Sequence, residues 1–386
     1  MSPRAIDWMN GAFMPTDSRA FPADVGLRAV APAPRTEWRK AFDADPSSQA
    51  FHSPEWVDGV CAAGGFEDVT RMYETHDGRG LVVPMVRRSY LGGVLSVQGS
   101  LPLGWGIGGV ISGDPIRPTD LSAIYADLRG QPGVLRTFIG PAARSGATWA
   151  AADLPRAKTA PRLCHVLDLE GGFGTVWSKR FTSTARTAVR KADKSGVVVE
   201  LDTTGARLPE YFTLVESSMK RWARQQHEPL LLSRLRTRRR ASMARLQALA
   251  AAVPTRFRLY LAMLDGQAVA GIIVYRGNGT RYTSGAMIKE LAGPVRANYL
   301  LHRTAIEDAC DAGSTHFDFG ESGASPGLAV YKTRFGARPE PYQNYVIERL
   351  PLTELDRSLR QAVKRVIGFQ EPADPEREGP GSGTAG

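Results

Sequence analysis

The stretch RFRLYLAMLDGQAVAGIIVYRGNGTRYTSGAM, residues 256–287, decides the fold of this chain. Apolar residues occupy alternate positions over 256–264, which is the pattern of a half-buried strand. Asp265-Gly266 supplies the turn residues of a tight hairpin, and the β-branched run that follows predicts its second strand. Asn278-Gly279 predicts a second hairpin. The stretch therefore predicts a three-stranded antiparallel meander.

A helix and a fourth strand follow the meander. Apolar residues recur at helical spacing between Asn298, a suitable N-cap, and Gly313, which suits the C-terminal cap. THFDFG, residues 315–320, then predicts a short strand that ends in glycine. A strand–helix–strand step of this length favours parallel pairing, so we expect a parallel strand attached to the meander. An open loop and a last strand complete the order of elements.

Three motifs in this half of the chain resemble those of a known family. They are FTSTARTAVRKADKSGV (181–197), VRANYLLHRTAIEDACDAG (295–313) and HFDFGESG…GLAVYKTRFGA (316–337). Together with the order of elements, they resemble the Fem-type branch of the Gcn5-related N-acyltransferase superfamily. Members of this branch build peptidoglycan cross-bridges or related amide bonds, and many take the acyl group from aminoacyl-tRNA. The resemblance implies an α/β fold of two tandem Gcn5-like lobes, in which mixed central sheets are flanked by helices.

The first half of the chain shows a similar order of elements in a less regular form. SPEWVDGVCAAGG predicts a helix capped by Ser53, and Asp77-Gly78 predicts a hairpin whose second strand Pro84 restricts to an edge or a bulge. A further helix and two strands follow before residue 170. We therefore divide the chain into a poorly ordered entry (1–45), a degenerate first lobe (46–172), a second lobe (173–350), a C-terminal helix (351–369) and a disordered tail (370–386).

The composition excludes several classes of protein. The chain contains no run of 18 or more apolar residues, which is the length needed to span a membrane. The first residues, MSPRAIDWMNGAF, lack the basic start and apolar core of a signal peptide, so we expect a cytoplasmic protein. The cysteines and histidines show no disulfide or metal-ligand spacing. A net charge of +10 favours polyanionic partners such as tRNA, nucleotide-linked substrates or the anionic inner face of a membrane. The protein would contact such a membrane peripherally.

The glycine-rich stretch GSLPLGWGIGGVISG (99–113) superficially resembles a dinucleotide-binding loop. Such a loop needs glycines at fixed spacing directly between a strand and a helix, with an acid about twenty residues later. Here the spacing differs, and Pro115 and Pro118 follow. We therefore interpret the stretch as an irregular loop, in which either Trp105 lines a substrate cleft or the glycines are purely structural.

Two basic segments are candidates for binding anionic groups. Arg186 and Arg190 share a face of the helix predicted within 181–197, and a matching segment in Fem-type proteins borders the substrate. The stretch 220–245 holds nine Lys or Arg against a single acid, which suits contact with RNA phosphates. Both patterns also fit a solvated helix surface, and the sequence leaves the two interpretations open.

Amide formation from an activated acyl donor needs few side chains, and the chain has no GxSxG motif. The resemblance places Lys332 at the acyl-transfer centre, where its charge stabilises the oxyanion or the 3′ end of the donor, with Phe335 shaping its loop. Asp318 and Glu321, at the end of the last core strand, are the candidate carboxylates for orienting or deprotonating the amine. Asp318 also fits a satisfied structural carboxylate. Tyr282 on the third strand is a candidate cleft-lining hydroxyl.

The acyl donor separates the candidate functions. Coenzyme A–dependent members of the superfamily bind pyrophosphate at a glycine-containing turn before the central helix. The corresponding turn here, AGPVRANYLL, offers Arg296 and Asn298 as substrate-binding residues, but it lacks those glycines and Pro294 removes one N–H. We therefore expect no cofactor, aminoacyl-tRNA as co-substrate, and an anionic or nucleotide-linked acceptor whose amine belongs to a cell-wall precursor or a small natural product. An acyl-CoA-dependent N-acetyltransferase of an amine or amino sugar is the alternative, and a catalytically silent pair of lobes that binds an anionic ligand is a third reading.

Overall fold

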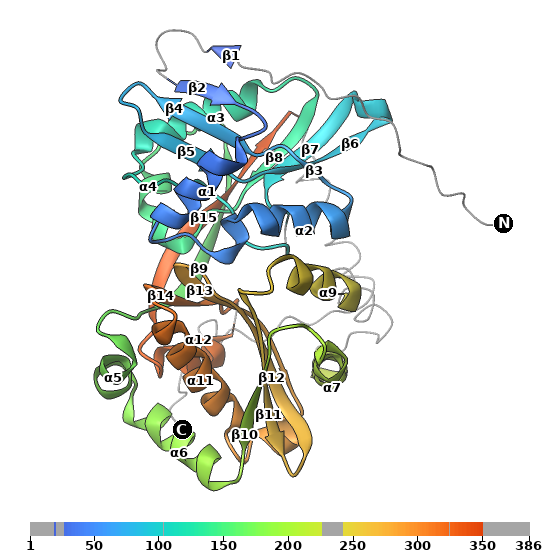
Figure 1. The fold of residues 1–386 in the computed structure, drawn as a ribbon, viewed down its shortest axis with the longest axis vertical. Coiled ribbons are helices and arrows are strands. Elements are labelled where there is room, and N and C mark those ends of the chain that lie inside the picture. The colour runs from blue at the N-terminus through green and yellow to red at the C-terminus, as the bar shows by residue number, and fades with distance from the viewer. Residues whose placement is uncertain (1–18, 21–26, 103, 226–241, 324, 350–386) are drawn as a thin grey trace, which may run out of the picture.

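The computed structural model describes residues 19–20, 27–102, 104–225, 242–323 and 325–349. They form two lobes that lie one above the other along the long axis of the molecule (Figure 1). The predicted helix over 351–369, the predicted tail over 370–386 and most of the basic stretch 220–245 lie outside the described residues.

The first half of the chain provides the following elements, in chain order: β1 (Arg19–Ala20), β2 (Leu27–Val30), α1 (Arg35–Ala44), η1 (Ala50–His52), α2 (Pro54–Gly64), β3 (Glu67–Asp68), β4 (Arg71–Thr75), β5 (Gly80–Val83), β6 (Val86–Tyr90), η2 (Leu91–Gly93), β7 (Leu95–Ser100), α3 (Pro118–Gly130), β8 (Val134–Ile139), η3 (Ala143–Ser145), α4 (Gly146–Ala150) and β9 (Lys158–Asp168).

The second half provides α5 (Gly172–Thr175), η4 (Val176–Arg180), α6 (Ser183–Lys194), β10 (Val198–Asp202), α7 (Leu208–Gln225), α9 (Met243–Ala252), β11 (Phe257–Leu264), β12 (Gln267–Tyr275), β13 (Gly279–Met287), α10 (Lys289–Ala292), α11 (Ala297–Asp311), β14 (His316–Glu321), α12 (Pro326–Thr333) and β15 (Arg338–Glu348).

The expectation of a loosely ordered entry over 1–45 is wrong for its later part, which forms β2 and α1. Trp38 and Phe42 of α1 are buried, and Trp38 Nε1 donates a hydrogen bond to the carbonyl oxygen of His52 at 2.7 Å. The helix buries only a narrow stripe of three residues, so its sequence carries little periodic signal.

One sheet of eleven strands runs through both lobes, in the order β10-β11-β12-β13-β14-β9-β15-β8-β7-β6-β3; β1-β2-β4-β5 form a second sheet. β9, the last strand of the first half, pairs with β14, whereas β15, the last strand of the second half, pairs with β8. β9 and β15 also pair with each other. Each half thus gives its final strand to the sheet of the other. The α/β class is confirmed, but the two expected central sheets are joined into one, and strands cross the predicted boundary at residues 172–173.

The meander that decides the fold is present as β11, β12 and β13, all antiparallel, and β14 lies parallel to β13 as predicted. Asp265 and Gly266 have φ of 49° and 76°, the left-handed pair that a tight hairpin turn requires. The prediction that its first strand is half-buried is wrong. Leu259 faces a core cluster that includes residues of α7 and α9, and Tyr260 faces a cluster that includes residues of α11, so helices cover both sides.

The second predicted hairpin turn has a different role. Asn278 and Gly279 are not in the left-handed region. Instead, Asn278 Nδ2 donates hydrogen bonds to the carbonyl oxygens of Phe42 at 3.3 Å and Asp45 at 2.8 Å, and Gly279 N–H donates to Ser48 O at 2.8 Å. This turn therefore attaches the second lobe to the segment that follows α1.

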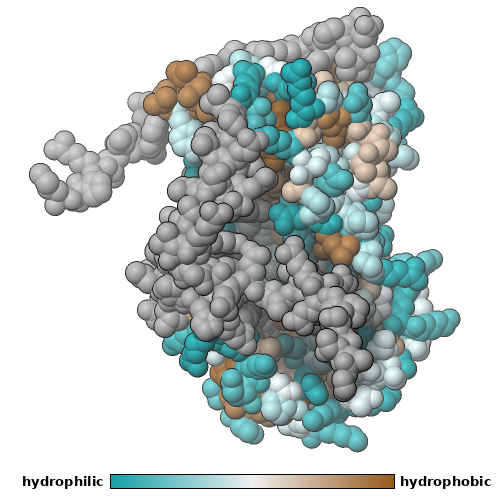
Figure 2. Space-filling model, turned by 180° about the vertical axis from the view of Figure 1, so that it is seen from behind, coloured by the Kyte–Doolittle hydropathy of each residue, from teal (hydrophilic) through white to brown (hydrophobic). Residues whose placement is uncertain are grey.

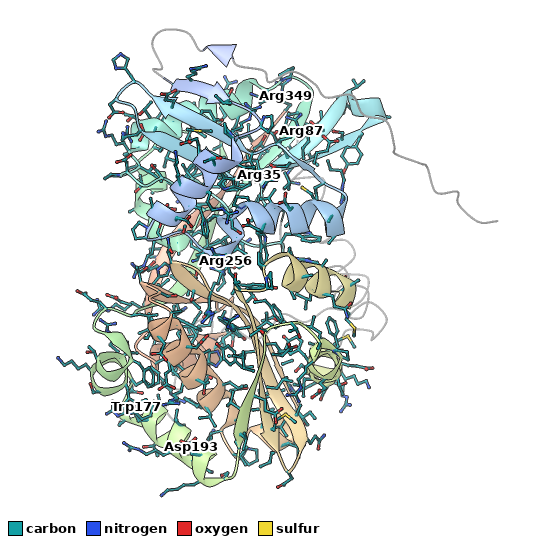
Figure 3. The ribbon with its side chains drawn as sticks, viewed as in Figure 1. Arg35, Arg87, Trp177, Asp193, Arg256 and Arg349 are labelled. Carbon is teal, nitrogen blue, oxygen red and sulfur yellow. The ribbon has the colours of Figure 1, made fainter. Side chains whose placement is uncertain are left out.

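A shared hydrophobic core also joins the lobes. Trp56 of α2 packs edge-on against Tyr275 of β12, with ring centroids 4.7 Å apart, and both belong to one cluster with Phe51 and Phe257. Arg256 lies at the junction of the lobes, its guanidinium 4.6 Å from the ring of Phe42 (Figure 3). The lobes therefore bury part of their apolar surface against each other.

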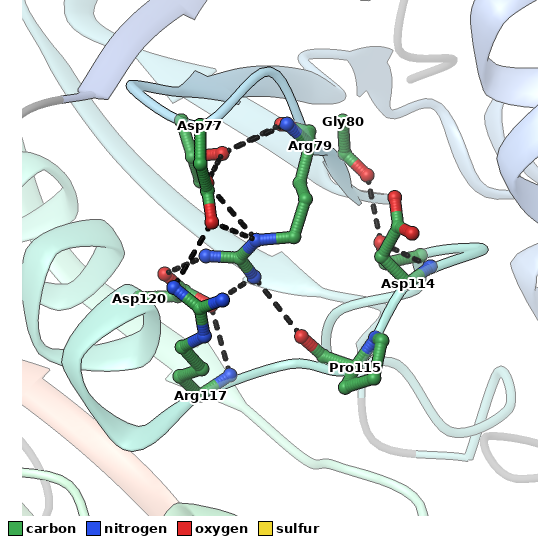
Figure 4. Close-up of polar contacts among 9 residues, drawn as sticks. Asp77, Arg79, Gly80, Asp114, Pro115, Arg117 and Asp120 are labelled. Carbon is green, nitrogen blue, oxygen red and sulfur yellow. Dashed lines mark hydrogen bonds and ion pairs between the residues drawn. The ribbon is translucent and has the colours of Figure 1, made fainter.

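A polar network fixes the β4–β5 turn of the first lobe against α3 (Figure 4). The Arg79 guanidinium donates to both carboxylate oxygens of Asp120, at 2.7 and 3.0 Å, and also to Asp77 and the carbonyl oxygen of Pro115. Asp120 accepts a further bond from the Arg117 N–H at the start of the helix. Asp120 and Asp77 together raise the pKa of Arg79 above its ordinary value.

The face seen from behind is mainly hydrophilic where it is coloured, with hydrophobic residues gathered in separate patches (Figure 2). Within the described ranges, no helix combines the length and the apolar character needed to cross a bilayer.

Candidate active site

The parallel strands β13 and β14 separate at their carboxyl ends. They pair at three positions only, Gly279 with His316, Thr280 with Phe317, and Arg281 with Asp318. β13 then continues to residue 287 and β14 to residue 321 without pairing to each other. Because ligands of open α/β sheets bind outside the carboxyl ends of the strands, this opening is the candidate site.

An aromatic wedge fills the start of the opening. The His302 ring of α11 lies 5.0 Å from the ring of Tyr282 on β13 and 5.4 Å from that of Phe319 on β14. Burial lowers the pKa of His302 to about 4, so the ring is neutral at pH 7. Tyr331 of α12 donates its hydroxyl proton to the carbonyl oxygen of Asn298 at 3.0 Å and packs on the same ring. The predicted cleft-lining hydroxyl, Tyr282, is thus part of this packing, and burial raises its pKa to about 12.

Lys332 is buried at the end of β14. Its Nζ donates hydrogen bonds to the carbonyl oxygens of Gly320 and Glu321, both at 2.8 Å. An ammonium group has three N–H donors, so one of them has no acceptor among the described residues. Burial lowers the pKa of Lys332 to about 8, and the group is still mainly charged at pH 7. The expected loop is absent, because Lys332 lies on α12, whose N-cap is Ser325.

Asp318 is saturated with hydrogen-bond donors. It pairs with Arg281 and accepts bonds from Cys164 Sγ and Gly320 N–H, both at 2.7 Å, and from Gln49 Nε2 at 3.4 Å. Burial by itself would raise the pKa of Asp318, but Arg281 and the hydrogen bonds from Cys164 and the Gly320 N–H hold it below the ordinary value. A carboxylate with a low pKa and no free lone pair is a poor proton acceptor. The geometry favours the structural role that the sequence had left open.

Glu321 lies at the surface beside this group. Its carboxylate accepts a hydrogen bond from the Tyr342 hydroxyl at 2.6 Å and forms an ion pair with Arg162 at 3.4 Å. Its own carbonyl oxygen holds Lys332. Glu321 therefore contacts the Lys332 ammonium through its carbonyl oxygen, and both of its side-chain oxygens have other partners.

A basic hollow of about 420 Å³ lies between α6, the start of α11 and the end of α12. Lys191, Arg296 and Arg334 line it, and among the described residues none of the three forms an ion pair. The Arg334 guanidinium donates a hydrogen bond to the Tyr299 hydroxyl at 2.8 Å. Three unpaired cations favour a ligand with several negative charges. The other lining residues are Ser183, Thr184, Thr187, Ala188 and Tyr299.

The turn before α11 differs from the prediction by two residues. The N-cap is Arg296, with φ of 60°, and Asn298 is already the second helical residue, its Nδ2 bonded to Met287 Sδ at 3.1 Å. Arg296 thus adopts the left-handed backbone that glycine usually provides, and its side chain lines the hollow. Asn298 supplies its carbonyl oxygen to Tyr331 and is not among the lining residues.

The predicted pair Arg186 and Arg190 does not line the hollow. The Arg186 guanidinium donates to carbonyl oxygens in the η4 turn, including those of Trp177 and Ser178 at 3.3 Å, and Arg190 is exposed. The face of α6 that lines the hollow carries Ser183, Thr184, Thr187 and Lys191 instead. The hydroxyl-bearing residues of this face recur at helical spacing, and the prediction based on the two arginines did not include that signal. Arg334 also escaped prediction.

Two other predicted residues have packing roles. Trp105 lies against Arg245, whose guanidinium is 3.8 Å from the indole ring, and accepts a hydrogen bond from Trp56 Nε1 at its carbonyl oxygen, 2.8 Å away. It is not among the residues that line the hollow. Phe335 is fully buried between the rings of Phe181 and Tyr331, at 5.1 and 5.2 Å.

Comparison with known proteins agrees with this architecture. A family model described as an acetyltransferase (GNAT) domain matches residues 179–333. The crystal structure of FemX aligns with 84% of this chain and 98% of its own, at 12% identity and a TM-score of 0.61. A conserved protein of unknown function from Bacteroides thetaiotaomicron aligns with 81% of this chain and 97% of its own, at 10% identity and a TM-score of 0.50. No curated protein sequence matches. The similar structures establish the fold, and the matched domain is that of an acyltransferase.

Proposed function

We propose that the chain belongs to the Fem-type branch and forms an amide by tRNA-dependent aminoacyl transfer, since residues 179–333 match an acetyltransferase (GNAT) domain and the fold is similar to that of FemX. The acceptor is an amine of a cell-wall precursor or a small natural product, anionic or nucleotide-linked, in solution or at a membrane surface. No cofactor takes part, and aminoacyl-tRNA is the co-substrate.

The basic hollow is the observation that carries this proposal. Lys191, Arg296 and Arg334 line it without acidic partners among the described residues, and it lies between α6, the start of α11 and the end of α12. A phosphodiester backbone approaching from outside suits such a group, because each phosphate adds one charge. The pantetheine arm of coenzyme A would instead need the space between β13 and β14, where His302 touches both Tyr282 and Phe319.

Lys332 supplies the chemistry at the ester. The acceptor amine attacks the aminoacyl carbonyl, the new C–N bond forms, and the negative charge collects on the carbonyl oxygen. Two carbonyl acceptors fix the Lys332 ammonium, so that it need not reorganise during the reaction and its third N–H is available to that oxygen. The ester C–O bond then breaks, and the ribose oxygen leaves with the proton that the amine nitrogen gives up.

One observation favours the acyl-CoA alternative. The N-terminal turn of α11 contributes Arg296 and Tyr299 to the hollow, and a helix N-terminus binds a pyrophosphate well. In that case the donor would be an acyl thioester and the acceptor an amine or amino sugar.

The test supplies the purified protein with tRNA charged with radiolabelled amino acids, or with radiolabelled acetyl-CoA, and a panel of amines. We expect label in an acid- and base-stable amide only with charged tRNA, and loss of transfer in Lys332→Ala. Transfer from acetyl-CoA alone would establish the alternative donor. Absence of transfer from either donor, with the fold intact by circular dichroism, would show that the lobes only bind a ligand.

A further inference from the structure

Asp318 and Glu321 lie near Lys332, and a third carboxylate, that of Glu340, has an oxygen without a hydrogen-bond partner among the described residues. In the sheet register, Glu321 of β14 pairs with Cys164 of β9, which pairs with Glu340 of β15. The three residues thus form a row across three adjacent strands. Strand spacing places the Cα atoms of Glu321 and Glu340 roughly 10 Å apart.

Glu340 differs from Asp318 and Glu321 in its hydrogen bonding. Its Oε2 is buried without any hydrogen-bond partner among the described residues, whereas the other two carboxylates are fully engaged. Burial raises the pKa of Glu340, against the opposing effect of Arg144. A buried carboxylate oxygen without a donor is costly, so the site is completed by a group that brings a proton.

Glu340 also lines an open groove of about 680 Å³. The strands β9 and β15 form its floor and η3–α4 its wall, with small or apolar side chains such as Ala147, Ala150, Pro161 and Pro341. Arg144 stands on the wall, exposed and, in the described part of the chain, without a hydrogen bond or ion pair. Tyr342, which also lines the groove, donates its hydroxyl proton to Glu321, and the backbone carbonyl oxygen of Glu321 accepts from Lys332, so two hydrogen bonds connect the groove lining to the Lys332 ammonium.

We propose that Glu340 binds the ammonium group of the acceptor and takes its proton, while Arg144 holds an anionic group of the same molecule. The acceptor is therefore an amine that also carries a carboxylate or a phosphate. This inference rests on the proposed amide-forming function. One proton passes from the ammonium to Glu340, the neutral amine attacks the acyl carbon, and a second proton leaves with the ribose oxygen, so that amide, free hydroxyl and protonated Glu340 balance the step.

The role of Glu340 is tested by its pH profile. Glu340→Gln should lower kcat/KM for the amine about 100-fold at pH 7, since general-base catalysis contributes about 100- to 10,000-fold. The deficit should shrink as the pH approaches the pKa of the amine, where free amine needs no base. A purely structural role would lower the rate equally at every pH, and that result would overturn the assignment.

The role of Arg144 is tested by binding, which needs no turnover. The probes are radiolabelled glycylglycine, O-phosphoethanolamine and glycylglycinamide, in equilibrium dialysis with the full chain. We expect the two anionic probes to bind, Arg144→Ala to weaken them about tenfold, and Ala147→Trp to block the groove. Glycylglycinamide should be insensitive to Arg144→Ala, and Arg129→Ala, an exposed arginine on α3 of the same lobe, is the matched control.

The outcomes separate this inference from the proposed function. Selective binding that Arg144→Ala weakens and Ala147→Trp blocks, without transfer from charged tRNA or acetyl-CoA, would sustain the groove and overturn the function. Transfer with probe binding that neither variant changes would sustain the function and overturn the groove. Preference for glycylglycine or for O-phosphoethanolamine identifies the anion as carboxylate or phosphate, and equal binding of all three probes would overturn the zwitterionic acceptor.

Discussion

The two lobes repeat one order of elements, yet their parallel strand pairs end differently. In the first lobe, β7 and β8 pair from Ser96 to the last residue of each strand, Ser100 and Ile139. In the second lobe, β13 and β14 pair only as far as Arg281 and Asp318 and then separate. The second lobe therefore has an opening at the place where the first has a continuous ladder.

The glycine-rich stretch 99–113 closes the end of the first pair. Gly108 N–H donates to the carbonyl oxygen of Gly140 at 2.8 Å, just beyond β8, and Gly140 N–H donates to Ser100 Oγ at 3.2 Å. A Cβ on residue 108 would lie 2.0 Å from the Ser100 carbonyl oxygen, so only glycine fits. In the second lobe, the carbonyl of Gly320 receives the Lys332 ammonium instead. The order of elements is thus shared, and the candidate site lies in the lobe whose parallel strands separate at their ends.

The largest effect is expected when that ammonium is removed. Lys332→Ala should lower kcat for transfer about 100- to 1,000-fold, the usual loss when one oxyanion donor is deleted. Ser100→Ala, which removes the hydroxyl at the closed end, is the matched control and should leave kcat within about twofold, because it removes no oxyanion donor. Similar losses for both variants would contradict the assignment of the site to the second lobe.

The pH dependence sharpens the same point. The pKa of Lys332 is about 8, and the charged form is the one that stabilises an oxyanion. The rate should therefore fall about tenfold per unit above pH 8, and Lys332→Arg should move the fall to higher pH. A rate that rises through pH 8 would mean that neutral lysine acts as a base.

The aromatic wedge between β13 and β14, which contains His302, should make the protein less stable in acid. His302 has a pKa of about 4 when folded and about 6.5 when unfolded, so the unfolded chain binds more protons between these values. The free energy of unfolding should therefore decrease as the pH is lowered, and this residue should account for a decrease of about 2 kcal/mol from pH 7 to pH 5. Urea unfolding of the wild type and His302→Phe at both pH values measures it, and an equal loss in the variant would rule out the histidine as the cause.

Substitutions in the closed lobe should change stability without changing catalysis. Tyr73 is fully buried and donates to Asp127 Oδ2 at 2.6 Å, a carboxylate that also pairs with Arg71. Tyr73→Phe should lower the free energy of unfolding by about 1.5–3 kcal/mol, typical of a hydrogen bond to a charged group. Activity per folded molecule should stay the same, and a changed KM would show that the first lobe takes a direct part.

The smallest effect concerns the basic hollow. Lys191→Ala should weaken tRNA binding several-fold and reduce the slope of log K against log salt by about 0.7–0.9, as expected when one phosphate contact is lost. Arg190→Ala, one residue away on the exposed face of α6, should leave the slope unchanged. Filter binding between 50 and 200 mM salt decides, and equal slopes for both variants would remove the hollow from the donor site.

Local signals predicted the local structure well. Ser53 caps α2, and Asp265-Gly266 makes its turn, because each depends on a few neighbouring residues. The exchange of β9 and β15 could not be predicted, since it depends on which distant strand edges meet. The helical state of Lys332 had a signal that was not used: Ser325-Pro326 is the usual N-cap and first-turn pair.

The site was predicted less completely than the fold. Lys332 lies at the centre of the expected group because a family motif marked it, and Asp318 and Glu321 lie beside it. The cations of the hollow come from two helices and a turn, so no single stretch of sequence showed them together. Glu340 lies in an Arg-Pro-Glu-Pro run that carries no signal of a site, and only the sheet register, which pairs Glu340 with Cys164, indicates a role for it.

The crossing of β9 and β15 has a consequence for how the chain is made. β8 is synthesised long before residues 338–348, which form its partner strand β15. The β8 edge of the first lobe therefore stays unpaired until nearly the whole polypeptide has emerged. A premature stop before residue 338 would consequently harm the amino-terminal lobe as much as the carboxy-terminal one. If the chain is instead cut between residues 168 and 172, one fragment keeps β9, which pairs with β14 of the other, and the other keeps β15, which pairs with β8 of the first. We therefore expect the two fragments to reassemble.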